Sequence, residues 1–232
     1  MPITPFKVEK IEDLTATIKR VVLLPQSSFS FVAGQYLQVV MDKDDKRPFS
    51  IANAPRADGT IELHIGAEPG NQYATQVIEK MQNDGVINIE GGLGTAHINL
   101  QPNKPIILLA GGTGFSYTWS ILQQLLSEPL NVPVYLYWGT RSKEDMYAYE
   151  ELAKLAEQHQ HFTFVPVFEF PPVNWTGKTG WVHQAVIADV QDLSNYQVYV
   201  AGRFEMAKVV KEDFTKLGLP DTALFGDAFA FI

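Results

Sequence analysis

The sequence predicts two domains, an antiparallel β domain followed by an α/β domain built on a parallel sheet. Short alternating segments separated by turn residues fill about the first hundred residues, which is typical of a small barrel or sandwich. Beyond them, apolar strands alternate with helical stretches, and this order favours a parallel sheet covered on both faces. The pattern of apolar residues changes at residues 101–105, so we expect domains over residues 1–101 and 102–232.

The β domain is predicted from apolar and polar alternation within short segments rich in β-forming residues. Turn signals such as Ala33-Gly34, Asp58-Gly59 and Asp84-Gly85 separate these segments. A single helical stretch interrupts them at residues 73–81, with Val77, Ile78 and Met81 apolar. The predicted strands are residues 6–11, 17–23, 36–41, 61–65 and 86–89, and residues 47–50 are expected at a strand end.

The α/β domain is predicted from apolar runs that lack alternation, because a central parallel strand is buried on both faces. The first of these runs, residues 106–110, is followed by a glycine-rich turn. The predicted strands are residues 106–110, 134–138, 162–167, 197–201 and 228–232. The predicted helices are residues 116–127, 147–158, 182–188 and 204–217.

Composition excludes several classes of function. The formal net charge is -8, whereas nucleic-acid surfaces need clustered Lys and Arg. No cysteine is present, which removes thiol nucleophiles, disulfides and Cys-ligated metals, so redox chemistry needs an organic cofactor. His159 and His161 fit a polar turn better than a metal site, and we expect no metal. With no signal pattern and no long apolar run, we expect a cytoplasmic protein without membrane spans.

Residues 110–116, Ala-Gly-Gly-Thr-Gly-Phe-Ser, lie between a buried strand and a helix. Glycines at such a turn let the backbone approach a ligand and leave the N–H groups of the helix start open to an anion. The segment is not a Walker loop, since no Gly-Lys-Ser or Gly-Lys-Thr follows, and it does not match G-x-G-x-x-G. A tight strand-to-helix turn without any ligand is the alternative.

Residues 46–53 carry a second candidate group. Arg47 is a fixed positive charge, Pro48 pins the backbone, Phe49 offers a flat apolar surface and Ser50 offers a hydroxyl that can donate to a ring nitrogen. The alternative is an ordinary strand that follows a hairpin turn, with Arg47 paired to the carboxylates of residues 42–45.

Two further segments lie near the C-terminus. Gly202 and Arg203 follow a predicted parallel strand, at the edge where ligands bind in open α/β sheets. Asp227 and Phe229 belong to an aromatic tail. A simple strand cap and a core-filling tail are the respective alternatives.

Taken together and in this order, Arg-Pro-Phe-Ser, Gly-Gly-Thr-Gly, Ala-Gly-Arg-Phe-Glu-Met-Ala and Asp-Ala-Phe-Ala-Phe-Ile resemble the ferredoxin-NADP reductase superfamily over the whole chain. Within it they look like the bacterial NAD(P)H:flavin oxidoreductases, the group of the general flavin reductase and its relative in luminescence operons. The resemblance implies an N-terminal flavin-binding β-barrel and a C-terminal NAD(P)-binding domain.

The resemblance also implies roles for individual residues. Ser50 would lie near flavin N5, the hydride-accepting atom, and Asp227 would orient the carboxamide of the nicotinamide. The flavin-binding residues would be Arg47, Pro48, Phe49, Ser50, His64, Ile65, Gly66, Tyr73 and Ala74. The nucleotide-binding residues would be Gly111, Gly112, Thr113, Gly114, Gly139, Arg141, Gly202 and Arg203, with Phe229 beside the rings.

The activity implied is reduction of riboflavin, FMN or FAD by NADH or NADPH, with the flavin as a substrate or loosely bound. The reduced flavin would serve ferric iron reduction, a monooxygenase or a luciferase. Arg141 can meet a 2′-phosphate, a ribose or a neighbouring carboxylate, so the choice between NADH and NADPH stays open. Two other hypotheses remain: a reductase component with tightly bound flavin that feeds an iron-sulfur partner, and a nucleotide-sensing module without catalysis.

Two departures from the superfamily pattern matter. Ala201 precedes Gly202 where many members have cysteine, so no thiol assists. Ala74 stands where many members have a hydroxyl that grips the flavin phosphate, although Thr75 takes that place if the register differs by one. Losing one hydrogen bond to a charged group weakens binding about 10–100-fold. We therefore expect a weak phosphate grip.

Overall fold

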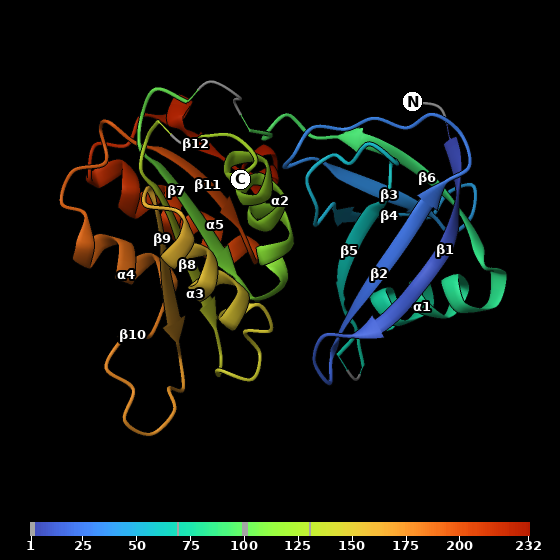
Figure 1. The fold of residues 1–232 in the computed structure, drawn as a ribbon, viewed down its shortest axis with the longest axis horizontal. Coiled ribbons are helices and arrows are strands. Elements are labelled where there is room, and N and C mark those ends of the chain that lie inside the picture. Colours follow the sequence, from blue (N-terminus) through green and yellow to red (C-terminus); the bar gives the residue numbers. More distant parts are fainter. Residues whose placement is uncertain (1–2, 69, 99–101, 130) are drawn as a thin grey trace. The chain divides into compact units, whose positions relative to one another are not determined.

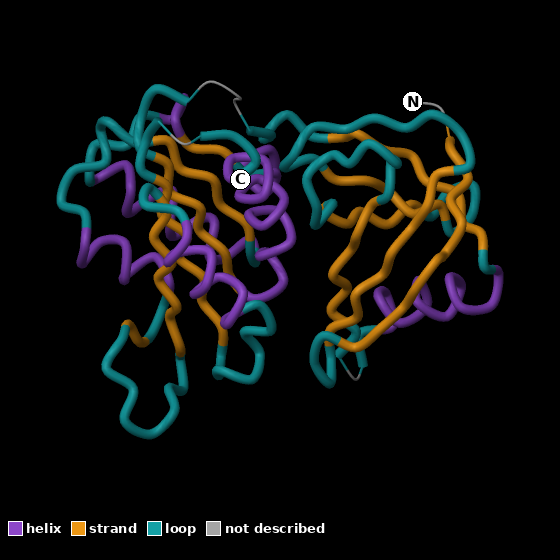
Figure 2. Tube along the Cα trace, viewed as in Figure 1, coloured by secondary structure: helices purple, strands orange, loops and turns teal. Residues whose placement is uncertain are grey.

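The computed structural model describes residues 3–68, 70–98, 102–129 and 131–232, and these form two compact units. One unit is Met1–Ile98 with Trp119–Gln124, and the other is Asn99–Thr118 with Leu125–Ile232. Figure 1 labels their helices and strands, and Figure 2 separates helix, strand and loop by colour. The predicted boundary at residues 101/102 falls beside residues 99–101, which lie outside the described residues, so it stays a prediction.

The first unit contains a six-stranded antiparallel sheet in the order β4-β3-β6-β1-β2-β5. Its strands are β1 (Ile3–Asp13), β2 (Ile18–Pro25), β3 (Tyr36–Val40), β4 (Lys46–Ser50), β5 (Ile61–Gly66) and β6 (Val86–Leu93). The edge strands β4 and β5 approach each other, because the Ala52 N–H donates to the Glu62 carbonyl at 2.7 Å. Asn53 adds a second link, since its Oδ1 accepts from the Glu62 N–H at 2.6 Å. The antiparallel β domain predicted from the sequence is confirmed.

Helix α1 (Gln72–Asp84) closes one side of this sheet through its apolar stripe. Val77, Ile78 and Met81 lie on that stripe and join a buried cluster with inward-facing strand residues such as Leu37 and Leu63. The helix begins at Asn71, whose side chain caps Ala74 N, and ends at Gly85, which has a left-handed φ of 67°. Helix α1 therefore holds its first turn in a defined place beside β4 and β5.

The second unit contains a six-stranded parallel sheet in the order β10-β9-β8-β7-β11-β12. Its strands are β7 (Ile106–Gly111), β8 (Val134–Thr140), β9 (Phe162–Phe168), β10 (Lys178–Thr179), β11 (Gln197–Ala201) and β12 (Leu224–Phe225). From β7 the chain runs outward through β8 and β9, then returns to place β11 on the other side of β7. The order therefore reverses between β7 and β11, and ligands of open α/β sheets bind at such a reversal.

Both faces of the parallel sheet are covered. On one face, α4 (Val182–Asp189) and α5 (Phe204–Lys216) pack Val186, Val210 and Phe214 against strand residues such as Ile107 and Val198. Elsewhere Phe115, at the start of α2 (Phe115–Leu126), stacks on Trp138 of β8 with ring centroids 3.8 Å apart. Helix α3 (Tyr149–Gln158) contacts β9. The predicted parallel-sheet domain is confirmed.

The C-terminal tail differs from the sequence prediction. Residues 228–232 were expected to form a strand, but Asp227–Phe231 form a 3-10 helix, η3. The strand in this place is the two-residue β12, which pairs Leu224 and Phe225 with Val198 and Tyr199. Because β11 ends at Ala201, residues beyond 227 have no strand left to pair with. The chain turns instead, and the Phe229 N–H donates to the Gly226 carbonyl at 3.1 Å.

The other predicted elements are present, with ends that differ by a few residues. The two-residue strands β10 and β12 and the 3-10 helices η1 (Gly112–Gly114) and η2 (Asp221–Ala223) were not predicted, because such short elements carry no periodicity. Among the described residues, no helix combines the length and apolar character needed to span a bilayer.

Candidate functional site

Strand β4 carries the Arg-Pro-Phe-Ser segment at an edge of the antiparallel sheet. Proline is tolerated there because an edge strand leaves one side of its backbone unpaired. Ser50 is partly buried at the end of β4, opposite Tyr36 of β3. Its hydroxyl makes no hydrogen bond to any of the residues that the structure describes. The strand end thus presents an uncommitted hydroxyl and an open backbone edge, which suit a planar ring with polar edge atoms.

Arg47 lies at the other end of this segment and is 8% exposed. Its Nε donates to both Asp45 carboxylate oxygens at 3.0 Å, and its Nη2 donates to Asp45 Oδ2 at 2.6 Å. Nη1 donates to the Tyr73 carbonyl at 2.6 Å, and Nη2 also donates to Gln76 Oε1 at 2.8 Å. Hydrogen bonding from Arg47 lowers the pKa of Asp45. Pairing of Arg47 with a hairpin carboxylate, an alternative from the sequence, is therefore present.

The start of α1 carries two of the predicted flavin contacts, Tyr73 and Ala74, and their neighbour Thr75. The Tyr73 ring lies under the Arg47 guanidinium, 4.7 Å from its centroid, and Tyr73 is 48% exposed. The Ala74 methyl group is buried in the core, so this position meets a ligand only through its backbone. The Ala74 N–H donates to Asn71 Oδ1 at 3.3 Å, and the Thr75 hydroxyl donates to the Asn71 carbonyl at 2.9 Å.

The remaining predicted flavin contacts lie on β5, the other edge strand of the sheet. Ile65 is buried in the core, whereas His64 and Gly66 are partly exposed. Burial lowers the pKa of His64 to about 4, so this imidazole is neutral at pH 7. It cannot supply a positive charge to a flavin phosphate, and its role as a ring contact stays a prediction.

In the second unit, the predicted nucleotide residues gather where β7 and β11 end side by side. A Cβ built on Gly114 would lie 2.3 Å from the Ala201 carbonyl oxygen. A Cβ on Gly202 would lie 2.5 Å from Met206 Cε and 3.5 Å from the Gly111 Cα. Gly114 is therefore required by the close packing of the two strand ends, independently of any ligand, whereas the atom nearest to a Cβ on Gly202 is the end of the flexible Met206 side chain.

Gly112 and Thr113 differ from their neighbours, because both are exposed within the short helix η1. Gly112 has a φ of +55°, and a Cβ there would meet nothing within 4 Å. Its carbonyl accepts from Trp138 Nε1 at 3.0 Å, which holds the turn. The surface open to a nucleotide at this turn is thus the backbone of residues 112–113.

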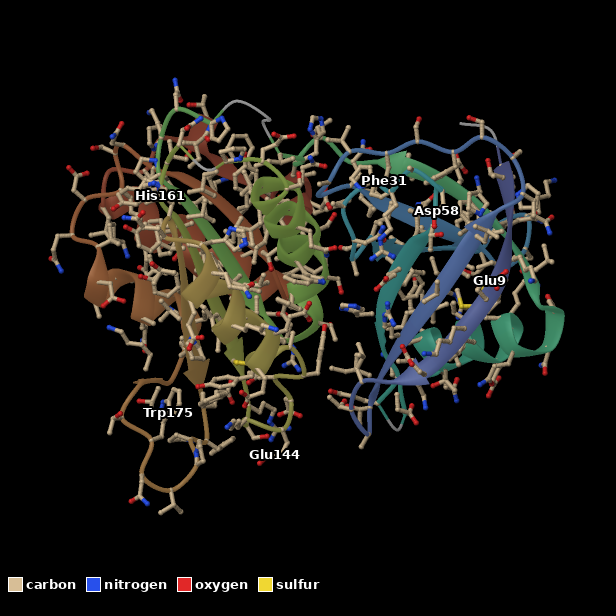
Figure 3. The ribbon with its side chains drawn as sticks, viewed as in Figure 1. Glu9, Phe31, Asp58, Glu144, His161 and Trp175 are labelled. Atoms are coloured by element: carbon tan, nitrogen blue, oxygen red, sulfur yellow. The ribbon has the colours of Figure 1, made fainter. Side chains whose placement is uncertain are left out.

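The end of β8 brings in two more predicted residues. A Cβ on Gly139 would lie 2.8 Å from Val182 Cβ, so the lack of a side chain here lets helix α4 pack closely against β8. Arg141 is exposed, and its guanidinium lies over the Phe170 ring, 5.9 Å from the centroid. The Phe170 N–H donates to the Arg141 carbonyl at 2.8 Å. Phe170 lies on the loop after β9, on which Figure 3 labels Trp175.

Asp227 begins η3 and is a partly buried carboxyl group. Burial raises its pKa to about 6. Phe229 packs against the core cluster of the second unit, and its ring lies 3.0 Å from a Cβ built on Gly226. The exposed aromatic group is instead Phe231, 77% exposed, whose ring packs edge-on to Phe204 at 6.1 Å. Sequence reasoning missed this pair because alternation in the tail does not show which ring turns outward.

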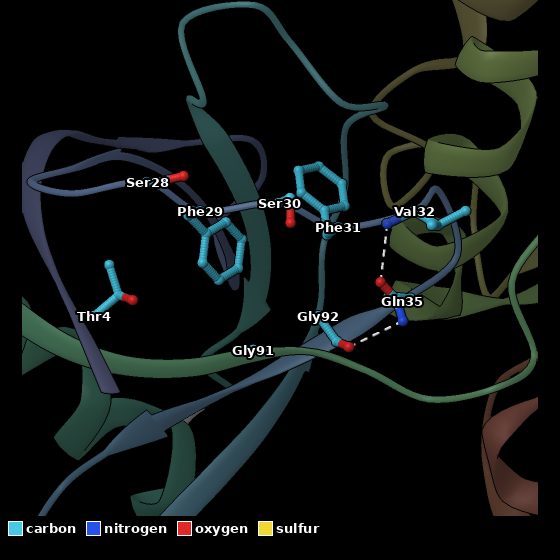
Figure 4. Close-up of a pocket in the computed structure, with 9 residues that line it drawn as sticks. All are labelled: Thr4, Ser28, Phe29, Ser30, Phe31, Val32, Gln35, Gly91 and Gly92. Atoms are coloured by element: carbon cyan, nitrogen blue, oxygen red, sulfur yellow. Dashed lines mark hydrogen bonds between the residues drawn. The ribbon is translucent and has the colours of Figure 1, made fainter. Parts of the chain in front are cut away.

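A cavity of about 480 Å³ lies elsewhere in the first unit, between the loop after β2 and strand β6 (Figure 4). Phe29 and Phe31 face it, and the Gln35 side chain braces its wall by donating to the Gly92 carbonyl at 2.9 Å. None of the predicted site residues lines it. The lining is Thr4, Ser28, Phe29, Ser30, Phe31, Val32, Gln35, Gly91 and Gly92. No cluster of His, Asp or Glu among the described residues has the composition of a metal site.

Sequence reasoning named a carboxylate of residues 42–45 as the alternative partner of Arg47, and the structure assigns this contact to Asp45. It missed Gln76 and Phe170 as neighbours of predicted site residues. These two carried no sequence signal, since only the fold brings them to Arg47 and Arg141.

The geometry and the family models define a class of protein. Residues 5–98 match the oxidoreductase FAD-binding domain, and residues 108–212 match the oxidoreductase NAD-binding domain. The antiparallel unit and the parallel-sheet unit are thus the flavin and nucleotide domains of an oxidoreductase. Among relatives, the chain is 46% identical to the NAD(P)H-flavin reductase of Vibrio harveyi, over 97% of this chain and 98% of that protein. It is 48% identical to the NAD(P)H-flavin reductase of Aliivibrio fischeri over the full length of both. The chain belongs to the NAD(P)H-flavin reductase family.

Solved structures support the fold. A ferredoxin reductase in carbazole 1,9a-dioxygenase superposes with a TM-score of 0.83 at 22% identity, covering 99% of this chain and 70% of that one. A ferredoxin NADP+ reductase from Neisseria gonorrhoeae, solved with FAD and NADP, gives a TM-score of 0.81 at 21% identity. That match covers 94% of this chain and 92% of the other.

Proposed function

We propose that this chain is an NAD(P)H-dependent flavin reductase that reduces free riboflavin, FMN or FAD. The observation that carries the proposal is full-length similarity, at 46% and 48% identity, to two NAD(P)H-flavin reductases. Hydride passes from the nicotinamide C4 to flavin N5, and a proton from solvent completes the reduced flavin. NAD(P)⁺ and reduced flavin then leave. Both ring systems bring their own reactivity, so the protein needs mainly to bind and orient them.

On the flavin side, Ser50 is the residue that we assign to N5. Its hydroxyl is uncommitted at the end of an edge strand, so it is free to donate to a ring nitrogen and to steady charge on the reduced ring. On the nucleotide side, the exposed backbone of residues 112–113 receives the nicotinamide end, and Asp227 orients the carboxamide. No histidine is assigned as a general base.

The flavin leaves after reduction because the phosphate grip is weak. Ala74 offers no hydroxyl, and the Thr75 hydroxyl is used within the helix. Reduced flavin then serves ferric chelates, a monooxygenase or a luciferase, and we place the enzyme in the cytoplasm. The visible spectrum tests release: the protein should be colourless after gel filtration. A stoichiometric yellow complex contradicts release and favours a reductase component with bound flavin.

Turnover tests the activity itself. The purified chain is mixed with NADH or NADPH and with riboflavin, FMN or FAD in turn, and loss of the nicotinamide absorbance is followed. Flavin-dependent loss is expected, with omission of flavin as the control. Absence of turnover with all three flavins and both nucleotides overturns the proposed function.

A further inference from the structure

Arg47 is the cation of the predicted flavin segment, and the protein itself uses most of its hydrogen-bonding capacity. A guanidinium has five N–H groups. Four of these donate within the first unit: Nε and one Nη2 hydrogen to Asp45, the other Nη2 hydrogen to Gln76, and one Nη1 hydrogen to the Tyr73 carbonyl. One N–H is left for an outside ligand. A phosphate that needs a two-pronged grip must therefore displace a partner.

The hairpin before β4 holds Asp45 in place for this contact. Asp42 Oδ1 accepts from the N–H groups of both Asp44 and Asp45 at 2.8 Å, and the Asp45 carbonyl accepts from the Met41 N–H at 2.9 Å. The carboxylate thus reaches Arg47 from a backbone that is already ordered, so the ion pair needs little further ordering. The neighbouring cation, Lys46, is paired with Glu90 at 2.5 Å.

The position of Arg47 along β4 matters for FMN. Strand residues rise about 3.3 Å each, so Arg47 lies roughly 10 Å from Ser50 along the strand. With N5 at Ser50, the ribityl chain needs a span of this size to bring its terminal phosphate to Arg47. Asp45 and the exposed Asp42 would then face a phosphate dianion, and like charges repel.

We propose that Asp45 is a specificity-determining residue that withholds Arg47 from the phosphate of FMN. Riboflavin ends in a hydroxyl and makes no such demand, so Asp45 lowers the use of FMN relative to riboflavin. This inference rests on the proposed function, because it assumes a flavin laid along β4. It assigns to the hairpin a role in substrate choice, whereas Arg47 serves chiefly to brace β4 against α1.

The direct test is Asp45→Asn, which keeps an acceptor for Arg47 but removes the charge. Dissociation constants for FMN and riboflavin are measured by quenching of flavin fluorescence, and kcat/KM is measured for both. One charge-assisted hydrogen bond gained by the phosphate should raise the FMN-to-riboflavin ratio about tenfold. Asp44→Asn is the matched control, because it removes the same charge from the same hairpin at an exposed side chain that does not touch Arg47. Its ratio should equal that of the wild type.

A second variant tests the same idea in the opposite direction. Gln76→Glu places another carboxylate on Arg47, at a position that already contacts Nη2. The FMN-to-riboflavin ratio should fall, and this result decides the matter if Asp45→Asn does not fold. A folded Asp45→Asn protein with the wild-type ratio overturns the inference, as does a Gln76→Glu protein with an unchanged ratio. Failure of the wild type to reduce any flavin overturns the proposed function instead, so the two failures are distinct.

Discussion

The flavin side and the nucleotide side of this protein are built in different ways. At β4, the candidate site consists of side chains, and Arg47 is held by Asp45, Gln76 and the Tyr73 carbonyl. At the ends of β7 and β11, the candidate site exposes the backbone of residues 112–113, and Gly114 is present because the Ala201 carbonyl leaves no room for a Cβ. The first region can therefore be tuned by single substitutions, whereas the second tolerates few.

This difference has a physical cause. Side-chain hydrogen bonds can be exchanged one at a time for other partners or for water, at a cost of about 1 kcal/mol each. Backbone crowding has no such alternative, because a carbonyl oxygen at 2.3 Å from a new Cβ cannot move without shifting its strand. Disturbing the backbone contact at Gly114 should consequently cost more stability than removing the side-chain hydrogen bonds of Arg47.

The largest effect is expected for Gly114→Ala. The new Cβ clashes with the Ala201 carbonyl, so the free energy of unfolding should fall by about 3 kcal/mol. Gly112→Ala is the control in the same turn, where space is open but φ is +55°, and it should cost about 1 kcal/mol. Urea unfolding of both proteins measures the difference. Equal losses would mean that crowding does not explain this turn.

The second-largest effect is expected for Arg47→Met. It leaves Asp45, Gln76 and the Tyr73 carbonyl without their donor, so the free energy of unfolding should fall by about 2 kcal/mol. Lys46→Met on the same strand is the control, because an exposed ion pair contributes less than about 1 kcal/mol. Both are measured by urea unfolding. If the two variants lose the same stability, Arg47 does not brace β4.

Ser50→Ala should act on turnover and leave stability unchanged. Loss of one donor to flavin N5 should lower kcat about tenfold while flavin still binds, since the ring retains its other contacts. Steady-state turnover and fluorescence quenching separate the two effects. Ser28→Ala, at an exposed loop hydroxyl of the same unit, is the control and should keep the wild-type rate. A Ser50→Ala enzyme with full turnover assigns Ser50 a structural role only.

The smallest effect concerns Asp227 and pH. Burial raises its pKa to about 6 in the folded state, above the usual range for an aspartate, so the protonated form is favoured by folding. The resulting stability is present below about pH 4 and is lost as the pH rises through about 6. Allowing for its partial exposure, the change is on the order of 1 kcal/mol.

Urea unfolding at pH 4.5 and pH 7 checks this prediction. The wild type should lose stability relative to Asp227→Asn between these two values, since asparagine does not titrate. Asp221→Asn, an exposed residue of the same C-terminal segment, is the control and should follow the wild type. Parallel pH profiles for the wild type and Asp227→Asn contradict the assigned shift.

Periodicity was sufficient to predict most of the fold. Alternating segments form β1, β2 and β5, and the apolar run at residues 106–110 forms the central strand β7, in which all five of these residues are buried. The predicted strand at residues 228–232 was wrong, because alternation does not show whether a segment has a strand to pair with. Whether residues 228–231 pair depends on where β11 ends, and that is a property of another part of the chain.

The candidate site shows the same division. The sequence by itself determined which residue types were available: a cation, a hydroxyl and a ring on β4, and glycines after β7 and β11. It determined the family as well, because the motifs and their order along the chain can be recognised without any knowledge of contacts. Only the tertiary structure decided what those residues already contact: that Asp45 occupies Arg47, that packing requires Gly114, and that Phe231 rather than Phe229 turns outward. The physical reason is that hydrogen bonds and close contacts join residues distant in sequence, whereas local patterns report only on neighbours.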